Sequence, residues 1–112
     1  MSIKIGEVTE FVNRMRSAIG KPPLEKLPKG KPCANNQCPI ALALDSPNVG
    51  NAYIQLTDQE QQDALAKLGC ERYEWAGGVV EFAIATPPLL QDFIKAFDKG
   101  ELEELIDGGG DA

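Results

Sequence analysis

The chain has 112 residues, a length typical of one globular domain and too short for two of ordinary size. It is 43% hydrophobic and 25% charged, which argues against wholesale disorder. Histidine is absent, which excludes the commonest general base and the commonest metal ligand. The formal net charge of −6 argues against a general affinity for nucleic acid or an anionic membrane.

The cysteine content and the absence of long apolar runs bear on location. No apolar run reaches the roughly 18 residues of a membrane span, and the opening residues do not resemble a signal peptide. Three cysteines are an odd number, whereas secreted disulfide frameworks use even and denser sets. We therefore expect a cytoplasmic protein with reduced thiols and no membrane partner.

The first half of the chain predicts two helices joined by a long connection. Apolar residues at steps of three and four between Ile5 and Ile19 predict an amphipathic helix that ends at Gly20. The pattern leaves open whether residues 2–5 are helix or strand. Residues 20–37 contain four prolines and predict an irregular connection. Residues 38–44 then predict a short buried helix, with a buried strand as the alternative.

The middle of the chain predicts a strand followed by a helix. Residues 52–56 alternate in polarity as a half-buried strand does. Thr57 and Glu60 have the spacing of a capping box, so we expect a helix to follow. This helix should bury Leu65 and Leu68 together with Ala64, and it should end at Gly69.

The last third predicts a hairpin and a final helix. Tyr73 and Trp75 lie on one side of a short extended run, Gly77-Gly78 suits a tight turn, and residues 79–85 alternate as the returning strand. Thr86 should cap a helix that begins at Pro87-Pro88. One more helical turn follows, and residues 108–112 should form a disordered glycine-rich tail.

These elements predict an α+β fold. About four helices should pack on a short, mostly antiparallel sheet that contains a β-hairpin. No composition break marks a domain boundary, so we expect a single compact domain over residues 1–107, with a long proline-rich connection at 20–37.

The cysteines are candidates for metal binding, disulfide formation or thiol chemistry. Cys33 and Cys38 are close enough in sequence to share a metal or a disulfide, and Cys70 is a candidate third ligand. A structural zinc site needs four ligands, and the chain has no histidine to complete one. Cys38 begins a predicted helix, where the dipole stabilises a thiolate. A Cys-His mechanism is excluded, so burial of Cys38 as a small apolar side chain is the simpler interpretation, and we expect no metal or other cofactor.

The charge is divided unevenly along the chain. Residues 1–50 carry seven basic and four acidic side chains, whereas residues 51–112 carry four basic and thirteen acidic ones. Such a division favours an interaction surface for a charged partner, either another protein or a second copy of the chain. The candidate residues of this surface are Arg14, Arg16, Lys21, Lys26, Lys29, Lys31, Glu101 and Glu104. Nucleic acid is disfavoured as the partner because the basic stretch contains no aromatic residue for base stacking.

Amide side chains suggest an alternative site for a small ligand. Amides donate and accept hydrogen bonds without charge, which suits recognition of polar ligands, although turn formation also explains their positions. The candidate residues are Asn35, Asn36, Gln37, Cys38, Asn48 and Asn51.

Two short stretches carry a resemblance to known proteins. Residues 38–44 (CPIALAL), together with Pro87-Pro88 and residues 93–100 (FIKAFDKG), resemble small uncharacterised proteins of actinobacteria and their phages. The matching residues cover about a fifth of the chain and are mainly packing and turn residues. The resemblance implies an intracellular accessory or host-interaction protein, and it carries no activity to any residue.

The sequence therefore favours a non-catalytic interaction or regulatory module over an enzyme. The signals for a fold are complete, whereas the usual catalytic groups are missing. A small-ligand binder or thiol-dependent enzyme centred on Cys38 is the alternative hypothesis.

Overall fold

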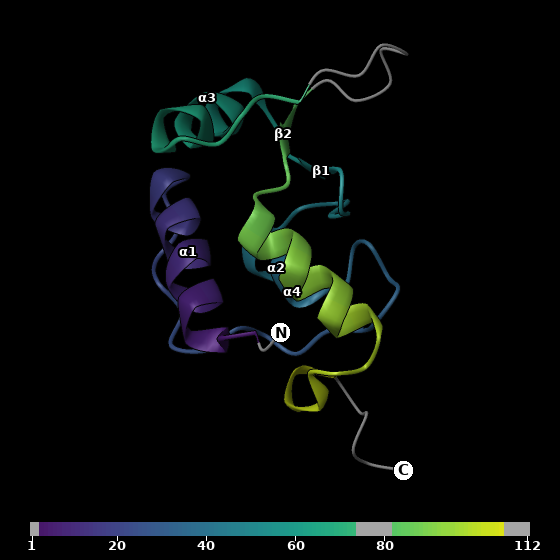
Figure 1. The fold of residues 1–112 in the computed structure, drawn as a ribbon. Coiled ribbons are helices and arrows are strands. Elements are labelled where there is room, and N and C mark those ends of the chain that lie inside the picture. Colours follow the sequence, from purple (N-terminus) through teal and green to yellow (C-terminus); the bar gives the residue numbers. More distant parts are fainter. Residues whose placement is uncertain (1–2, 74–81, 107–112) are drawn as a thin grey trace.

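The computed structural model describes residues 3–73 and 82–106 (Figure 1). In these ranges the elements are α1 (Ile5–Ala18), α2 (Pro39–Leu44), β1 (Tyr53–Gln55), α3 (Gln59–Leu68), β2 (Ala83–Ala85), α4 (Pro88–Asp98) and the 3₁₀ turn η1 (Glu103–Leu105). Four helices and a short antiparallel sheet confirm the predicted α+β class.

The sheet pairs strands that are separated in sequence by the whole of α3. β1 runs antiparallel to β2, with Tyr53 opposite Ala85 and Gln55 opposite Ala83. On the other side of β2, Arg72 forms an antiparallel bridge to Ile84. Residues 71–73 thus run antiparallel to β2, as the two arms of the predicted hairpin should. The expected turn at Gly77-Gly78, with Trp75 and residues 79–81, lies outside the described residues, as does the expected tail.

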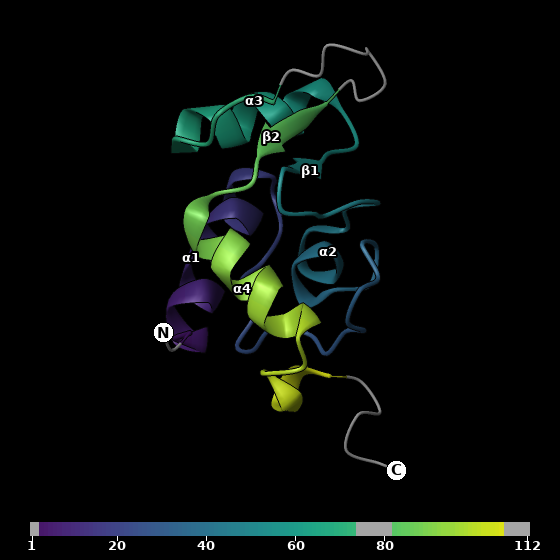
Figure 2. The ribbon, with the colours of Figure 1, turned by 45° about the vertical axis from the view of Figure 1, so that its right-hand side comes forward.

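The core is formed by one face of every helix together with the sheet. α1 contacts α2, α3 and α4, and it runs along one side of the molecule in Figure 1, while Figure 2 gives a second view of the same helices. The fully buried side chains include Val8, Val12, Met15, Ile40, Leu44, Ile54, Leu65, Ile84, Leu90, Phe93 and Phe97. Most of these residues belong to the predicted apolar stripes, because the 3.6-residue period already separates core-facing from solvent-facing positions.

The start and end of α1 resolve one question left by the sequence. Lys4 is extended, and the first helical residue is Ile5, so residues 3 and 4 do not extend the helix. Gly20 has φ +81°, a left-handed conformation that glycine adopts at low cost, and the chain leaves the helix there as expected.

Two leucines expected in the core are exposed. Leu42 in α2 is 40% exposed, because this short helix packs by its other positions and keeps one face in solvent. Leu68 in the last turn of α3 is 42% exposed, although Leu65 in the same helix is fully buried. The helical period identified the stripe correctly, but its last residue lines a cavity beside Phe11 of α1 instead of being buried.

The helix caps also differ from those predicted. Asp58, not Thr57, caps α3: its Oδ1 accepts a hydrogen bond from the N–H of Gln61 at 2.9 Å. The Gln61 side chain in turn accepts from the N–H of Thr57 at 3.2 Å, so the reciprocal arrangement is shifted by one residue. Thr86 does not cap α4, because its hydroxyl donates to the carbonyl of Gly50 at 2.6 Å.

Among residues 3–73 and 82–106, no helix combines the length and apolar character that crossing a membrane requires.

Candidate functional site

The three cysteines lie in three different environments. Cys33 is exposed, and its thiol lies 3.8 Å from the backbone carbonyl of Asp98. Cys38 is buried, and Cys70 is half-buried after the end of α3. All three are free thiols, and within the described ranges no group of three potential ligands is arranged to hold a metal ion. The structure does not bring the cysteines together.

Cys38 serves as the N-cap of α2. Its sulfur accepts a hydrogen bond from the N–H of Ala41 at 3.4 Å, and the residue is only 3% exposed. Burial raises the pKa of the Cys38 thiol, and this effect outweighs the helix N–H groups that favour the thiolate. The thiol therefore stays protonated near neutral pH, and the geometry favours the structural role over a reactive one.

The predicted amide site is an exposed loop rather than a pocket. The N–H of Lys31 donates to the carbonyl of Gln37 at 2.8 Å and closes the loop, and the N–H of Val49 donates to the carbonyl of Asn35 at 2.8 Å. These bonds bring the two amide-rich segments side by side. Asn48 donates through its side chain to the Tyr53 hydroxyl at 3.1 Å, so its amide supports the turn. None of the six candidate residues lines either of two cavities, of about 550 and about 590 Å³, that the described residues form.

Two of the six basic residues predicted for the interaction surface are engaged within the protein. Arg16 donates to the backbone carbonyls of Pro22 and Ala43, and Lys21 forms an ion pair with Asp45. These two residues attach α1 and the connection to α2. The pairing with Lys21 lowers the pKa of the Asp45 carboxyl group.

The basic connection (residues 20–37) and the acidic residues of η1 (Glu103–Leu105) are neighbours in the structure. The N–H of Gly30 donates to the carbonyl of Leu105 at 2.8 Å, which joins the connection to η1. Lys26, Lys29 and Glu104 line one cavity of about 590 Å³ between them. Opposite charges therefore lie close together here, and this mixture does not present a surface of one sign to a partner. Lys31 and Glu101 are exposed but do not line that cavity.

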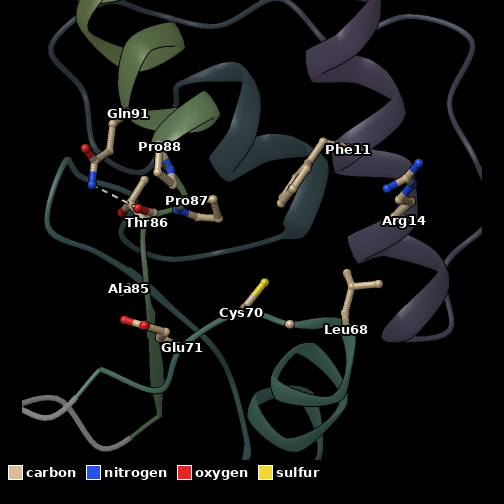
Figure 3. Close-up of a pocket in the computed structure, with 11 residues that line it drawn as sticks. Phe11, Arg14, Leu68, Cys70, Glu71, Ala85, Thr86, Pro87, Pro88 and Gln91 are labelled. Atoms are coloured by element: carbon tan, nitrogen blue, oxygen red, sulfur yellow. Dashed lines mark hydrogen bonds between the residues drawn. The ribbon is translucent and has the colours of Figure 1, made fainter.

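A second large cavity lies between α1, the end of α3 and the start of α4. It has a volume of about 550 Å³, within the range of roughly 300–1,000 Å³ that is usual for binding pockets. Figure 3 shows the ring of Phe11 and the sulfur of Cys70 pointing into this space, with Leu68 and Pro87 beside them. Its lining is mainly apolar, and we call it the Phe11–Leu68 groove.

Polar groups lie at the rim of the groove. Gln91 donates from its side chain to the carbonyl of Thr86 at 2.9 Å, so its amide is held at the edge (Figure 3). Arg14 forms an ion pair with Glu10 at 3.2 Å, and both side chains are more than half exposed. Burial raises the pKa of the Cys70 thiol, which keeps this wall of the groove uncharged near neutral pH.

A smaller hollow continues the groove along α1. It is lined by Glu7, Glu10 and Leu89, and it shares Phe11 and Arg14 with the main cavity. An apolar floor with a charged margin is the arrangement found at protein–protein interfaces.

The sequence did not predict this groove: of its lining residues it singled out Arg14, for a charged surface, and Cys70, as a candidate metal ligand. Phe11, Leu68 and Pro87 come from distant parts of the chain, so no local motif connects them. One feature of the sequence does point to the groove. Leu68, the last apolar residue on the core-facing side of α3, comes directly before Gly69, which ends the helix.

Comparison with known proteins gave no relative for this chain. No protein-family model, no curated protein and no solved structure matches it. The resemblance of residues 38–44 and 93–100 to actinobacterial and phage proteins thus stays a hypothesis, and a functional proposal has to rest on the residues themselves.

Proposed function

We propose that this protein is a non-catalytic interaction module that docks a partner protein in the Phe11–Leu68 groove. The observation that carries the proposal is the exposure of Leu68, at 42%, beside an apolar cavity of about 550 Å³. The exposed part of the Leu68 side chain represents about 1 kcal/mol of burial free energy, which a partner gains when it covers the groove.

The chemistry of the groove supports binding rather than catalysis. Its walls offer a protonated thiol, prolines and an aromatic ring, whereas its charged groups are at the margin. Arg14 is the one cation of the lining, and it is paired with Glu10. The Cys70 thiol points into the groove, but burial raises its pKa, which disfavours the thiolate that nucleophilic catalysis needs.

An accessory or host-interaction role, as the resemblance implies, is compatible with this proposal. Such proteins act by occupying a surface of another protein, which requires an apolar contact area and no reaction centre. The small-ligand and thiol-enzyme alternative centred on Cys38 has less support, because that thiol is buried away from the groove.

Site-specific photo-crosslinking in cells of the native host tests the proposal. A photoreactive residue at position 68 reports on the groove, and one at position 42 is the matched control, since Leu42 is equally exposed but lines neither large cavity. We expect a discrete protein adduct from position 68 alone. The same adducts from both positions, or none from either, would contradict the proposal.

A further inference from the structure

The charges around the groove point to the chemistry of its occupant. Three carboxylates, those of Glu7, Glu10 and Glu71, line the groove and its continuation, against the single guanidinium of Arg14. Arg14 pairs with Glu10, and Glu7 has only a long contact to Lys4, at 4.0 Å, between two well-exposed side chains. The margin therefore carries excess negative charge.

Glu71 is the carboxylate with the least compensation. It is exposed on the side of the groove opposite α1, and within the described residues it takes part in no ion pair (Figure 3). The adjacent cation, Arg72, is directed to another element, because its guanidinium binds Asp63 at 2.6 Å. Carboxylates thus lie on both sides of the apolar lining: Glu71 on one side, and Glu7 and Glu10 of α1 on the other.

We infer that the groove binds a short protein segment whose apolar residues are flanked by lysine or arginine. This inference rests on the proposed function and adds the chemistry of the partner. The apolar residues of the segment would cover Phe11 and Leu68, and its cations would lie against the carboxylates of α1 and Glu71. The same carboxylates repel nucleic acid and anionic membrane surfaces, and they favour a basic protein segment as the occupant.

Two synthetic peptides test the inference by fluorescence anisotropy. Both carry leucines at positions i, i+4 and i+7, as helix-in-groove ligands do, and they differ only in having lysine or glutamate at the remaining positions. We expect the lysine peptide to bind at least about tenfold more tightly, and this advantage should shrink as salt rises from about 0.05 M to about 0.5 M.

Variants assign the preference to the groove rather than to the net charge of the protein. Glu71→Gln should weaken binding of the lysine peptide about two- to fivefold, since exposed charge pairs contribute about 0.4–1 kcal/mol. Glu103→Gln, which removes an exposed carboxylate on η1, is the matched control and should have no effect beyond the change in net charge. Leu68→Ser should abolish binding, whereas a merely general attraction to an acidic protein would survive it.

The outcomes separate this inference from the proposed function. If the two peptides bind equally, the inferred preference for basic segments is wrong. The proposed function, docking of a partner in the groove, would still stand. Weakening by Glu103→Gln as strong as by Glu71→Gln would also overturn the inference, because the preference would then belong to the whole surface. If neither peptide binds, the inference is wrong, and crosslinking at position 68 still decides whether the groove docks a protein at all.

Discussion

The guanidinium of Arg16 in α1 donates a hydrogen bond to the backbone carbonyl of Ala43 in the last turn of α2. Carbonyls at the end of a helix lack partners within the helix, so this bond satisfies one of them. A second bond from Arg16 reaches the carbonyl of Pro22 at 2.8 Å and fixes the start of the connection. A side chain that the sequence suggested for partner binding therefore holds two helices and a loop together.

Replacing Arg16 should consequently lower stability. We expect Arg16→Ala to reduce the free energy of unfolding by about 1–3 kcal/mol, because two hydrogen bonds from a charged donor are lost. Arg14→Ala, which removes an exposed ion pair on the same helix, should change it by less than about 0.5 kcal/mol. Urea denaturation of both variants measures the difference, and equal effects would show that Arg16 has no structural role.

Gly30 should be intolerant of even one added methyl group. A Cβ at this position would lie 2.2 Å from the carbonyl oxygen of Gln37 and 2.9 Å from the Cδ of Pro39. We expect Gly30→Ala to cost at least about 2 kcal/mol of unfolding free energy, because backbone rather than a flexible side chain would have to move.

Gly6 provides the matched control for that substitution. It lies in the first turn of α1, and an added Cβ would meet nothing within 4 Å. Gly6→Ala should therefore stabilise the protein by about 0.4–1 kcal/mol, since alanine loses less conformational entropy on folding. Thermal unfolding of the two variants should give shifts of opposite sign, and shifts of the same sign would contradict the close approach at Gly30.

The shifted cap of α3 predicts which residue stabilises that helix. Asp58→Ala should cost about 1 kcal/mol because the N–H of Gln61 loses its acceptor. Thr57→Ala should cost less than about 0.5 kcal/mol, since in the structure Thr57 takes part through its backbone N–H, which alanine retains. Chemical denaturation distinguishes the two, and a larger effect at Thr57 would favour the cap expected from sequence.

The buried thiols should make stability fall in mildly alkaline solution. Burial raises the pKa values of Cys38 and Cys70 in the folded state, so the unfolded chain loses these protons first. Stability should therefore be complete below the ordinary thiol pKa of about 8.5 and decline as pH rises through and above it. Urea midpoints measured between about pH 7 and about pH 9.5 should fall more steeply in the native protein than in a Cys38→Ala, Cys70→Ala variant. Parallel curves would exclude the thiols as the cause.

Local elements were predictable because their signals are local. The apolar stripe of α1, Pro39 at the first position of α2 and Gly69 after α3 each act within a few residues of the element they define. The pairing of β1 with β2 could not be predicted in the same way. It joins residues about thirty apart across α3, and many such pairings satisfy the same alternation.

The candidate site was less predictable than the fold for a related reason. The groove depends on how the middle of α1, the end of α3 and the start of α4 are placed around one space, which brings Phe11, Leu68 and Pro87 together. The charge counts show that the first half of the sequence is basic and the second half acidic, but they do not show which segments meet. In the structure, the hydrogen bond from the N–H of Gly30 to the carbonyl of Leu105 brings the basic connection next to the acidic η1.

The modification rate of Cys70 tests the docking groove most directly. Cys70 lines the groove, whereas Cys33 is exposed elsewhere and provides an internal control in the same molecule. With a thiol reagent and mass spectrometry, saturating lysine-flanked peptide should slow modification of Cys70 at least about tenfold and leave Cys33 unchanged. If the peptide slows both cysteines equally, or Cys70 not at all, the groove is not where the segment binds.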